Sequence, residues 1–99
     1  MKRFIILYKG PATPPDASHQ GWPEWFGGLG DKLIDKGHPL LEGWSVGASE
    51  TNAVQAAKLN GYSIIQANDS GEARSLLASH PYIALGADHT IELYEIPVA

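Results

Sequence analysis

Histidine supplies the clearest candidates for acid–base chemistry in this chain of 99 residues, which has four histidines and no cysteine. His19 stands just before Trp22 and Trp25, where the sequence predicts the start of a helix. An imidazole there could act as a general acid or base, with its pKa set by burial and a neighbouring carboxylate. The competing interpretation is an exposed loop histidine without a catalytic role. We carry His19 forward as the candidate catalytic residue.

The remaining histidines, His38, His80 and His89, do not form a metal-binding pattern. No two histidines of the chain stand four residues apart, and no His-x-His occurs. Structural zinc sites draw on cysteine and closely spaced histidine. The glycines of segment 27–30 do not make a nucleotide-binding loop, because Leu33 stands where the third glycine of that motif belongs. We therefore expect neither a metal nor a cofactor.

A small-molecule pocket is expected at the start of the first helix. Trp22 and Trp25 could line an apolar site, although the same spacing is typical of core residues. His80 or Tyr82 is expected to approach from the other end. The proline-rich loop 10–17 leads into this helix and could close the pocket over it. An aromatic molecule bearing a carboxylate would suit such a site.

Composition restricts the partners and the location. The formal net charge is −4, which disfavours nucleic acid as a partner. The apolar run near the N-terminus, residues 4–8, is shorter than the ~7–15 residues of a signal-peptide core. No stretch approaches the ~20 apolar residues of a membrane span. We expect a cytoplasmic protein that binds neither nucleic acid nor membrane.

The apolar pattern predicts four strands, separated by two helices. The strands are expected over 3–9, 41–49, 61–67 and 89–97. Thr51-Asn52 is expected to form a turn. The order β-α-β-β-α-β predicts one α+β domain over residues 1–99, of the ferredoxin-like kind, with an antiparallel four-stranded sheet and two helices on one face.

The first helix is expected from residue 18 or 22 to residue 36. Its apolar residues recur at helical spacing, and Gly37 is a suitable residue just past its end. The glycines within it weaken a helix, and we expect close packing against the sheet to require them. The second helix begins near Asp69, which with Glu72 resembles a capping box.

The face of the sheet without helices is expected to be apolar. One parity along the strands supplies seven apolar or aromatic side chains: Phe4, Ile6, Tyr8, Tyr62, Ile64, Tyr94 and Ile96. A face of that kind is too apolar to remain in water. Since one self-complementary patch suffices for a two-fold interface, the chain is expected to form a homodimer through this face.

The order and spacing of several segments resemble the YCII-related (DGPF-type) domain family over nearly the full length of the chain. The segments that carry the resemblance are 4–10, the helix with Trp22 and Trp25, Pro39-Leu40, 61–65, Glu72-Ala73, His80-Pro81 and 91–93. The resemblance implies a ferredoxin-like fold of the dimeric α/β barrel type and a pocket between helices and sheet. It also implies a histidine that works with an acidic partner, and some relatives are similar to dehydrochlorinases. The Asp-Gly-Pro-Phe signature is absent, with Ser49-Glu50-Thr51-Asn52 in its place, and Asp16 stands where the family usually has arginine.

Two functions from different classes follow. The first is a dimeric domain that binds a small molecule, with cofactor-independent lyase or isomerase chemistry through His19. The second is a structural or accessory dimerisation domain without chemistry. The two differ in whether His19 points into a closed cavity or into solvent.

Overall fold

The structure is a computed structural model that describes residues 1–11, 21–54 and 59–97. Its elements in chain order are β1 (Lys2–Lys9), α1 (Trp22–Leu29), the 3-10 helix η1 (Gly30–Lys32), β2 (Leu33–Asp35), β3 (Trp44–Val46), β4 (Thr51–Ala53), β5 (Gly61–Ala67), α2 (Ser70–Leu77), the 3-10 helix η2 (Pro81–Leu85) and β6 (Thr90–Ile96).

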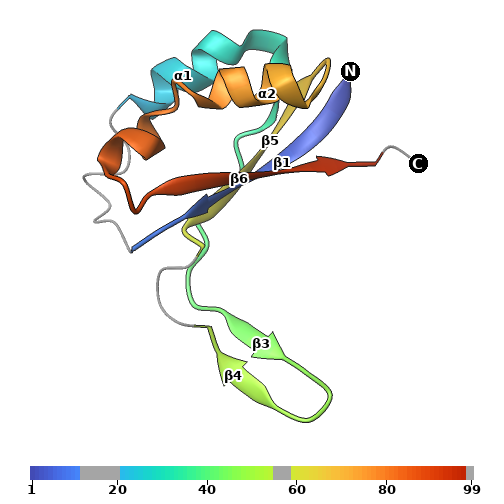
Figure 1. The fold of residues 1–99 in the computed structure, drawn as a ribbon, viewed down its shortest axis with the longest axis vertical. Coiled ribbons are helices and arrows are strands. Elements are labelled where there is room, and N and C mark those ends of the chain that lie inside the picture. Colours follow the sequence, from blue (N-terminus) through green and yellow to red (C-terminus); the bar gives the residue numbers. More distant parts are fainter. Residues whose placement is uncertain (12–20, 55–58, 98–99) are drawn as a thin grey trace.

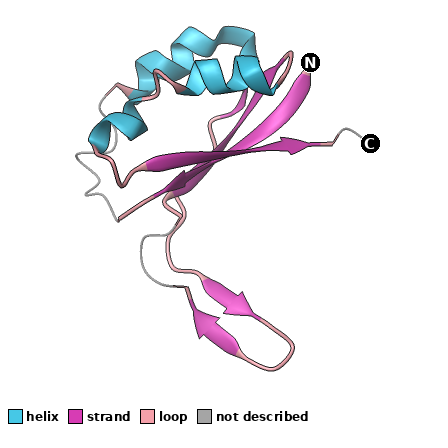
Figure 2. Ribbon diagram, viewed as in Figure 1, coloured by secondary structure: helices cyan, strands magenta, loops and turns pink. Residues whose placement is uncertain are grey.

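The main sheet has four strands in the order β2-β5-β1-β6, and each neighbouring pair is antiparallel. Figure 1 shows α1 and α2 on the same side of this sheet. The α+β class, the antiparallel four-stranded sheet and the two helices are therefore as expected. Figure 2 shows a second, smaller sheet, the hairpin of β3 and β4, which extends from the main sheet on the side away from the helices.

The residues under the helices differ from those expected there. Phe4, Ile6 and Tyr8 were assigned to the open face, but all three are buried in the core beneath the helices. The register explains the difference, because Phe4 pairs with Ile65 and Ile6 with Ser63. Directly paired residues share a face of the sheet. The even-numbered residues of β1 therefore share a face of the sheet with the odd-numbered residues of β5. Residues of the same parity in all the strands do not form one face.

The open face is still largely apolar. The side chains of the three long strands that share it are Arg3, Ile5, Leu7, Lys9, Tyr62, Ile64, Gln66, Thr90, Glu92, Tyr94 and Ile96. The expected members Tyr62, Ile64, Tyr94 and Ile96 do belong to it, joined by Ile5 and Leu7 in place of the β1 residues named above. Lys9 and Glu92 form an ion pair at its edge, with Nζ and Oε2 3.3 Å apart.

The first helix is shorter than expected. It ends at Leu29, and the chain passes through η1 into β2, so the prediction of a helix to residue 36 is wrong. Gly30 has φ 59°, which turns the chain out of the helix. Leu33, which matches the helical spacing, instead points from β2 toward the core and pairs with Ile65. A three-residue strand is too short to reveal its own periodicity.

The expected strand over 41–49 is also corrected. Only residues 44–46 form a strand there, and this β3 pairs with β4 rather than with the main sheet. The turn lies at 47–50, closed by the Gly47 N–H donating to the Glu50 carbonyl at 2.8 Å. Residues 51–52, expected as the turn, belong to β4 instead. The place of the predicted second strand in the main sheet is taken by β2.

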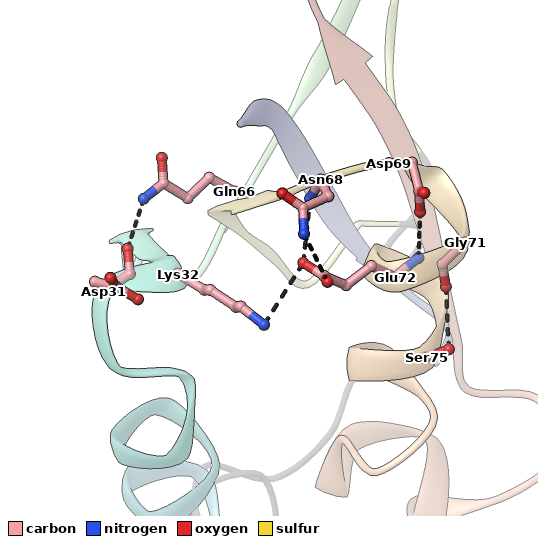
Figure 3. Close-up of polar contacts among 8 residues, drawn as sticks. All are labelled: Asp31, Lys32, Gln66, Asn68, Asp69, Gly71, Glu72 and Ser75. Carbon is pink, nitrogen blue, oxygen red and sulfur yellow. Dashed lines mark hydrogen bonds and ion pairs between the residues drawn. The ribbon is translucent and has the colours of Figure 1, made fainter.

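Asp69 caps the second helix as expected, whereas the Glu72 side chain reaches back to the residue before the cap. The Glu72 N–H donates to Asp69 Oδ1 at 2.8 Å, and the Glu72 carboxylate accepts from the Asn68 N–H at 3.1 Å. Figure 3 shows Lys32 reaching from η1 to the same carboxylate, with Nζ and Oε1 3.5 Å apart. These contacts, the Asn68 N–H first, lower the pKa of Glu72. The start of α2 is thereby tied to the end of the segment that leads into β2.

Both α-helices in the described ranges have eight residues. In that part of the chain, no helix has the length and hydropathy that a membrane crossing requires.

Candidate functional site

The four predicted pocket residues are brought together in one aromatic cluster. The ring of His80 lies 4.7 Å from that of Trp22 and 4.1 Å from that of Trp25, measured between centroids. Tyr82 lies 6.2 Å from Trp22, and both contact Tyr8. His80 and Tyr82 are each 1% exposed. His19, the candidate catalytic residue, lies outside the described residues.

His80 begins a chain of buried hydrogen bonds in the core, between the sheet and the helices that cover it. Its Nδ1 accepts from the Tyr82 N–H at 2.9 Å, so the ring proton sits on Nε2. Nε2 lies 3.2 Å from the Tyr8 hydroxyl, which lies 2.7 Å from Ser63 Oγ. Ser63 in turn donates to the Lys36 carbonyl at 2.6 Å. Because a carbonyl can only accept, each proton in the chain points from His80 toward Lys36.

Burial controls the ionisation of this chain. It lowers the pKa of His80 to about 4 and raises the pKa of Tyr8 to about 12, the latter partly opposed by the hydrogen bond to Ser63. Both groups are therefore neutral near pH 7. Every polar side-chain atom of this hydrogen-bond network has a partner, which is how a stable protein accommodates buried polar groups. The arrangement suits a structural network that links the start of η2 through β1 and β5 to the residue that follows β2.

Asn60 fixes the end of the cluster where β1 leaves the sheet. Its Nδ2 lies 2.8 Å from the Tyr82 hydroxyl and 3.1 Å from the Pro11 carbonyl. Gly10 packs closely here, since a Cβ at that position would lie 2.8 Å from the Asp88 carbonyl oxygen. Burial raises the pKa of Tyr82, with Asp88 adding to the rise and Asn60 opposing it. Gly10 and Pro11, which follow β1, are thus held against η2 and the start of β6.

His89 and Asp88 form a second site with acid–base character. His89 Nδ1 lies 2.9 Å from Asp88 Oδ1, and the His89 ring packs on Tyr82 at 5.2 Å. The His89 side chain is 9% exposed, and its Nε2 is buried without a hydrogen-bond partner among the described residues. A carboxylate on Nδ1 selects the tautomer whose Nε2 carries a lone pair. This is the arrangement of a histidine oriented by an acid.

A groove of about 510 Å³ lies between α2, η2 and β6. Its lining is Ser70, Arg74, Leu77, Ala78, Ile83, Ile91 and Leu93. The walls are aliphatic, and Arg74 is the only charged lining residue. Arg74 uses its Nε to donate to the Ser70 carbonyl at 3.3 Å. Its other donors have no partner among the described residues, so they are available to an acidic group.

A second groove of similar volume lies between α1 and α2. Trp25 lines it together with Leu29 and Leu76, and the Trp25 indole N–H donates to the Leu76 carbonyl at 3.2 Å. Of the four predicted pocket residues, Trp25 is the one that contributes to either groove. Glycines 27 and 28 were expected to pack tightly on the sheet, but both are exposed and a Cβ there would meet nothing within 4 Å.

Sequence reasoning missed three contributors: Ser63, Arg74 and the Asp88–His89 pair. The alternation Gly61, Ser63, Ile65 on one face of β5 was a usable signal, since a serine among buried positions needs a hydrogen-bond partner. Arg74 carried no local signal, because an arginine on a short helix is ordinarily solvated.

In the described ranges no three histidine, aspartate or glutamate side chains come together as they would around a metal ion. Comparison with family models, curated proteins and solved structures finds no match to this chain.

Proposed function

We propose that this protein is a small-molecule-binding domain that holds an apolar ligand with an acidic group in the groove between α2 and β6. The observation that carries the proposal is the pairing of an aliphatic groove with one arginine whose donors, apart from Nε, have no partner among the described residues. Ligand sites are typically apolar with a few polar groups that fix orientation.

Different parts of the groove would contact the hydrocarbon portion and the carboxylate of the ligand. The hydrocarbon part would lie on Leu77, Ile91 and Leu93, where contact removes apolar surface from water. The carboxylate would meet the Arg74 guanidinium, which presents a fork of N–H donors that matches two carboxylate oxygens. The size and charge of the groove therefore favour aromatic or branched carboxylic acids over sugars, nucleotides or cations.

A thermal-shift and calorimetric comparison of phenylacetate with phenylacetamide tests this assignment. The wild-type protein should bind the acid and not the amide. Arg74→Gln should weaken binding of the acid about tenfold or more, because a charge-assisted hydrogen bond contributes roughly 1.5–3 kcal/mol. Arg3→Gln is the matched control, since it removes the other arginine of the chain, on the open face of the sheet.

If both arginine variants lost the same affinity for phenylacetate, net charge alone would explain the loss. The groove would then be excluded as the binding site. Binding of acid and amide with the same affinity would remove Arg74 from the recognition.

A proton-transfer reaction is the second function, favoured by the Asp88–His89 pair. His89 lies just before β6 in the chain, two residues before Ile91 of the groove. An imidazole with Nδ1–H held by a carboxylate can accept a proton at Nε2, as cofactor-independent lyases and isomerases require. Deuterium exchange into a bound acid by the wild-type protein, and not by His89→Gln, would separate this function from binding alone. His19 remains the alternative base.

We also propose that the fold is ferredoxin-like and that the chain is related to the YCII-type domains. The strand order β2-β5-β1-β6 and the placement of both helices on one side support this assignment. In that architecture the open face is the interface of a homodimer. The apolar centre of the face, with Ile5, Ile64 and Tyr94 at neighbouring register positions, supports the same arrangement here. If the grooves bind nothing, this dimer would be the whole function.

A further inference from the structure

We propose that the β3–β4 hairpin is a dimerisation arm, which lays its apolar face against a second copy of this chain docked on the open face of the sheet. The inference rests on the homodimer proposed above and adds to it a specific contact. The arm is defined here as residues 41–54.

The arm has one apolar and one polar face. Trp44 pairs with Ala53 and Val46 with Thr51, so these four side chains share a face. Ser45 and Asn52 form the opposite face. Trp44 is 61% exposed and Val46 77%. Alternation of this kind is typical of a strand with one buried face, yet in the single chain neither face is covered.

The arm is too small to be stable by itself. Each of its strands has three residues, and an isolated two-stranded hairpin is marginal in water. A partner that covers the Trp44 face would supply the missing contacts.

The direction of the arm identifies a second copy as the partner. Figure 1 shows the arm projecting from the sheet on the side opposite α1 and α2, which is the side of the open face. A second copy docked on that face would therefore lie beside the arm. By the two-fold symmetry of such a dimer, each arm would flank the other copy.

The area of the open face also favours a contribution from the arm. The three long strands, of seven or eight residues each, present a flat footprint of about 14 by 24 Å, or about 340 Å² before side-chain relief enlarges it. A stable interface buries about 800 Å² on each partner. The sheet alone makes a small interface, and an apolar arm beside it enlarges the contact.

Charge favours the same partner. The arm carries Glu42 and Glu50 and no lysine or arginine. The open face carries the Lys9–Glu92 ion pair and also Arg3, which has no ion-pair partner among the described residues. An acidic arm is thus attracted to the face that an identical chain presents.

Analytical ultracentrifugation of the full chain tests the proposal. The wild-type protein should be a dimer, and Trp44→Asp should raise its dissociation constant at least tenfold. Ser45→Asp is the matched control, because it adds the same charge to the polar face of the same strand. Its dissociation constant should change less than threefold. Replacement of residues 44–53 by Asn-Gly, between Gly43 and Val54 whose backbones are hydrogen-bonded, should match Trp44→Asp.

The outcomes separate the arm from the dimer. If the wild-type protein is a dimer and Trp44→Asp behaves like Ser45→Asp, the arm proposal is overturned while the open-face dimer stands. If the wild-type protein is monomeric at high micromolar concentration, both are overturned. Binding of phenylacetate is measured separately and does not depend on either result.

Discussion

His80 is buried, although an imidazole exposed to mildly acidic water readily takes up a proton. Burial lowers its pKa to about 4, from 6.5 in an exposed histidine. The hydrogen bonding of the ring fits the neutral form, since Nδ1 accepts from a backbone N–H and a second proton would have no place there. A charged imidazole inside the aromatic cluster would break the hydrogen bond from Tyr82 and leave an unpaired charge. The histidine therefore stabilises the fold only while it is neutral.

The consequence is a defined dependence of stability on pH. Between pH 6.5 and about 4 the unfolded state binds a proton at His80 that the folded state does not. The free energy of unfolding should therefore fall as the pH is lowered through this window, by about 3 kcal/mol from this residue. Urea unfolding at several pH values measures the slope. NMR titration of the His80 ring should give a midpoint near 4, and a midpoint near 6.5 would contradict the assignment.

Among the elements, β2 depends on a glycine that permits close packing at its end. Gly37 has φ 77°, and a Cβ there would lie 1.7 Å from the Tyr62 carbonyl oxygen. Gly37→Ala should therefore destabilise the protein by about 2 kcal/mol or more, through strain and displacement of β2 from β5. Gly27→Ala in α1 is the matched control, because a Cβ there meets nothing and alanine favours the helix. It should stabilise by about 0.5–1 kcal/mol.

Urea denaturation of the two alanine variants measures both the expected loss of stability in Gly37→Ala and the expected gain in Gly27→Ala. A neutral Gly37→Ala would mean that the end of β2 can move away from Tyr62 without loss of pairing.

Long elements with complete local signals were predictable from the sequence. The strands β1, β5 and β6 have seven or eight residues each and were placed to within one residue. The start of α2 was fixed by Asp69 and Glu72, whose side chains satisfy backbone donors within one turn. These elements carry their signals within their own residues, an apolar run for each strand and a capping residue for the helix, and such signals can be recognised without a fold.

Features that depend on pairing with distant residues, and that leave no pattern of their own in the sequence, were not predictable. Leu33 has helical spacing relative to α1, and only its pairing with Ile65 makes it a strand residue. The face of each β1 side chain depends on register with β5, which no pattern within β1 reveals. The same limit applies to the site. Proximity of Trp22, Trp25 and His80 was anticipated, but the link from His80 through Tyr8 to Ser63 joins residues from three separate segments.

The whole molecule is more extended than a compact domain of its size. Its radius of gyration is 14.4 Å, against about 13 Å for a globular domain of 100 residues. Its longest dimension, 42 Å, runs along the direction in which the arm projects. The body carries two grooves on its helical side, and its opposite side is an apolar sheet face with the arm beside it. Ligand binding and self-association are thus assigned to opposite sides of the sheet and can be altered independently.

That separation gives a prediction for the whole molecule. Tyr94 is 54% exposed on the open face, in the edge strand β6, so Tyr94→Glu should leave the folded monomer intact. In a dimer the new carboxylate would be buried against its symmetry mate without a partner, and it should therefore make the protein monomeric. The wild-type melting temperature should rise with protein concentration because association stabilises the folded state, whereas that of Tyr94→Glu should not.

Ile83→Glu is the matched control for this variant. It places the same carboxylate on an exposed isoleucine of η2, on the helical side of the sheet. It should weaken binding of phenylacetate, since Ile83 lines the groove beside Arg74, and leave the dimer unchanged. Tyr94→Glu should do the reverse, with a monomeric protein that still binds the acid. A Tyr94→Glu protein that remains dimeric would show that the two copies do not meet through the sheet, and the function of the arm would then have to be sought elsewhere.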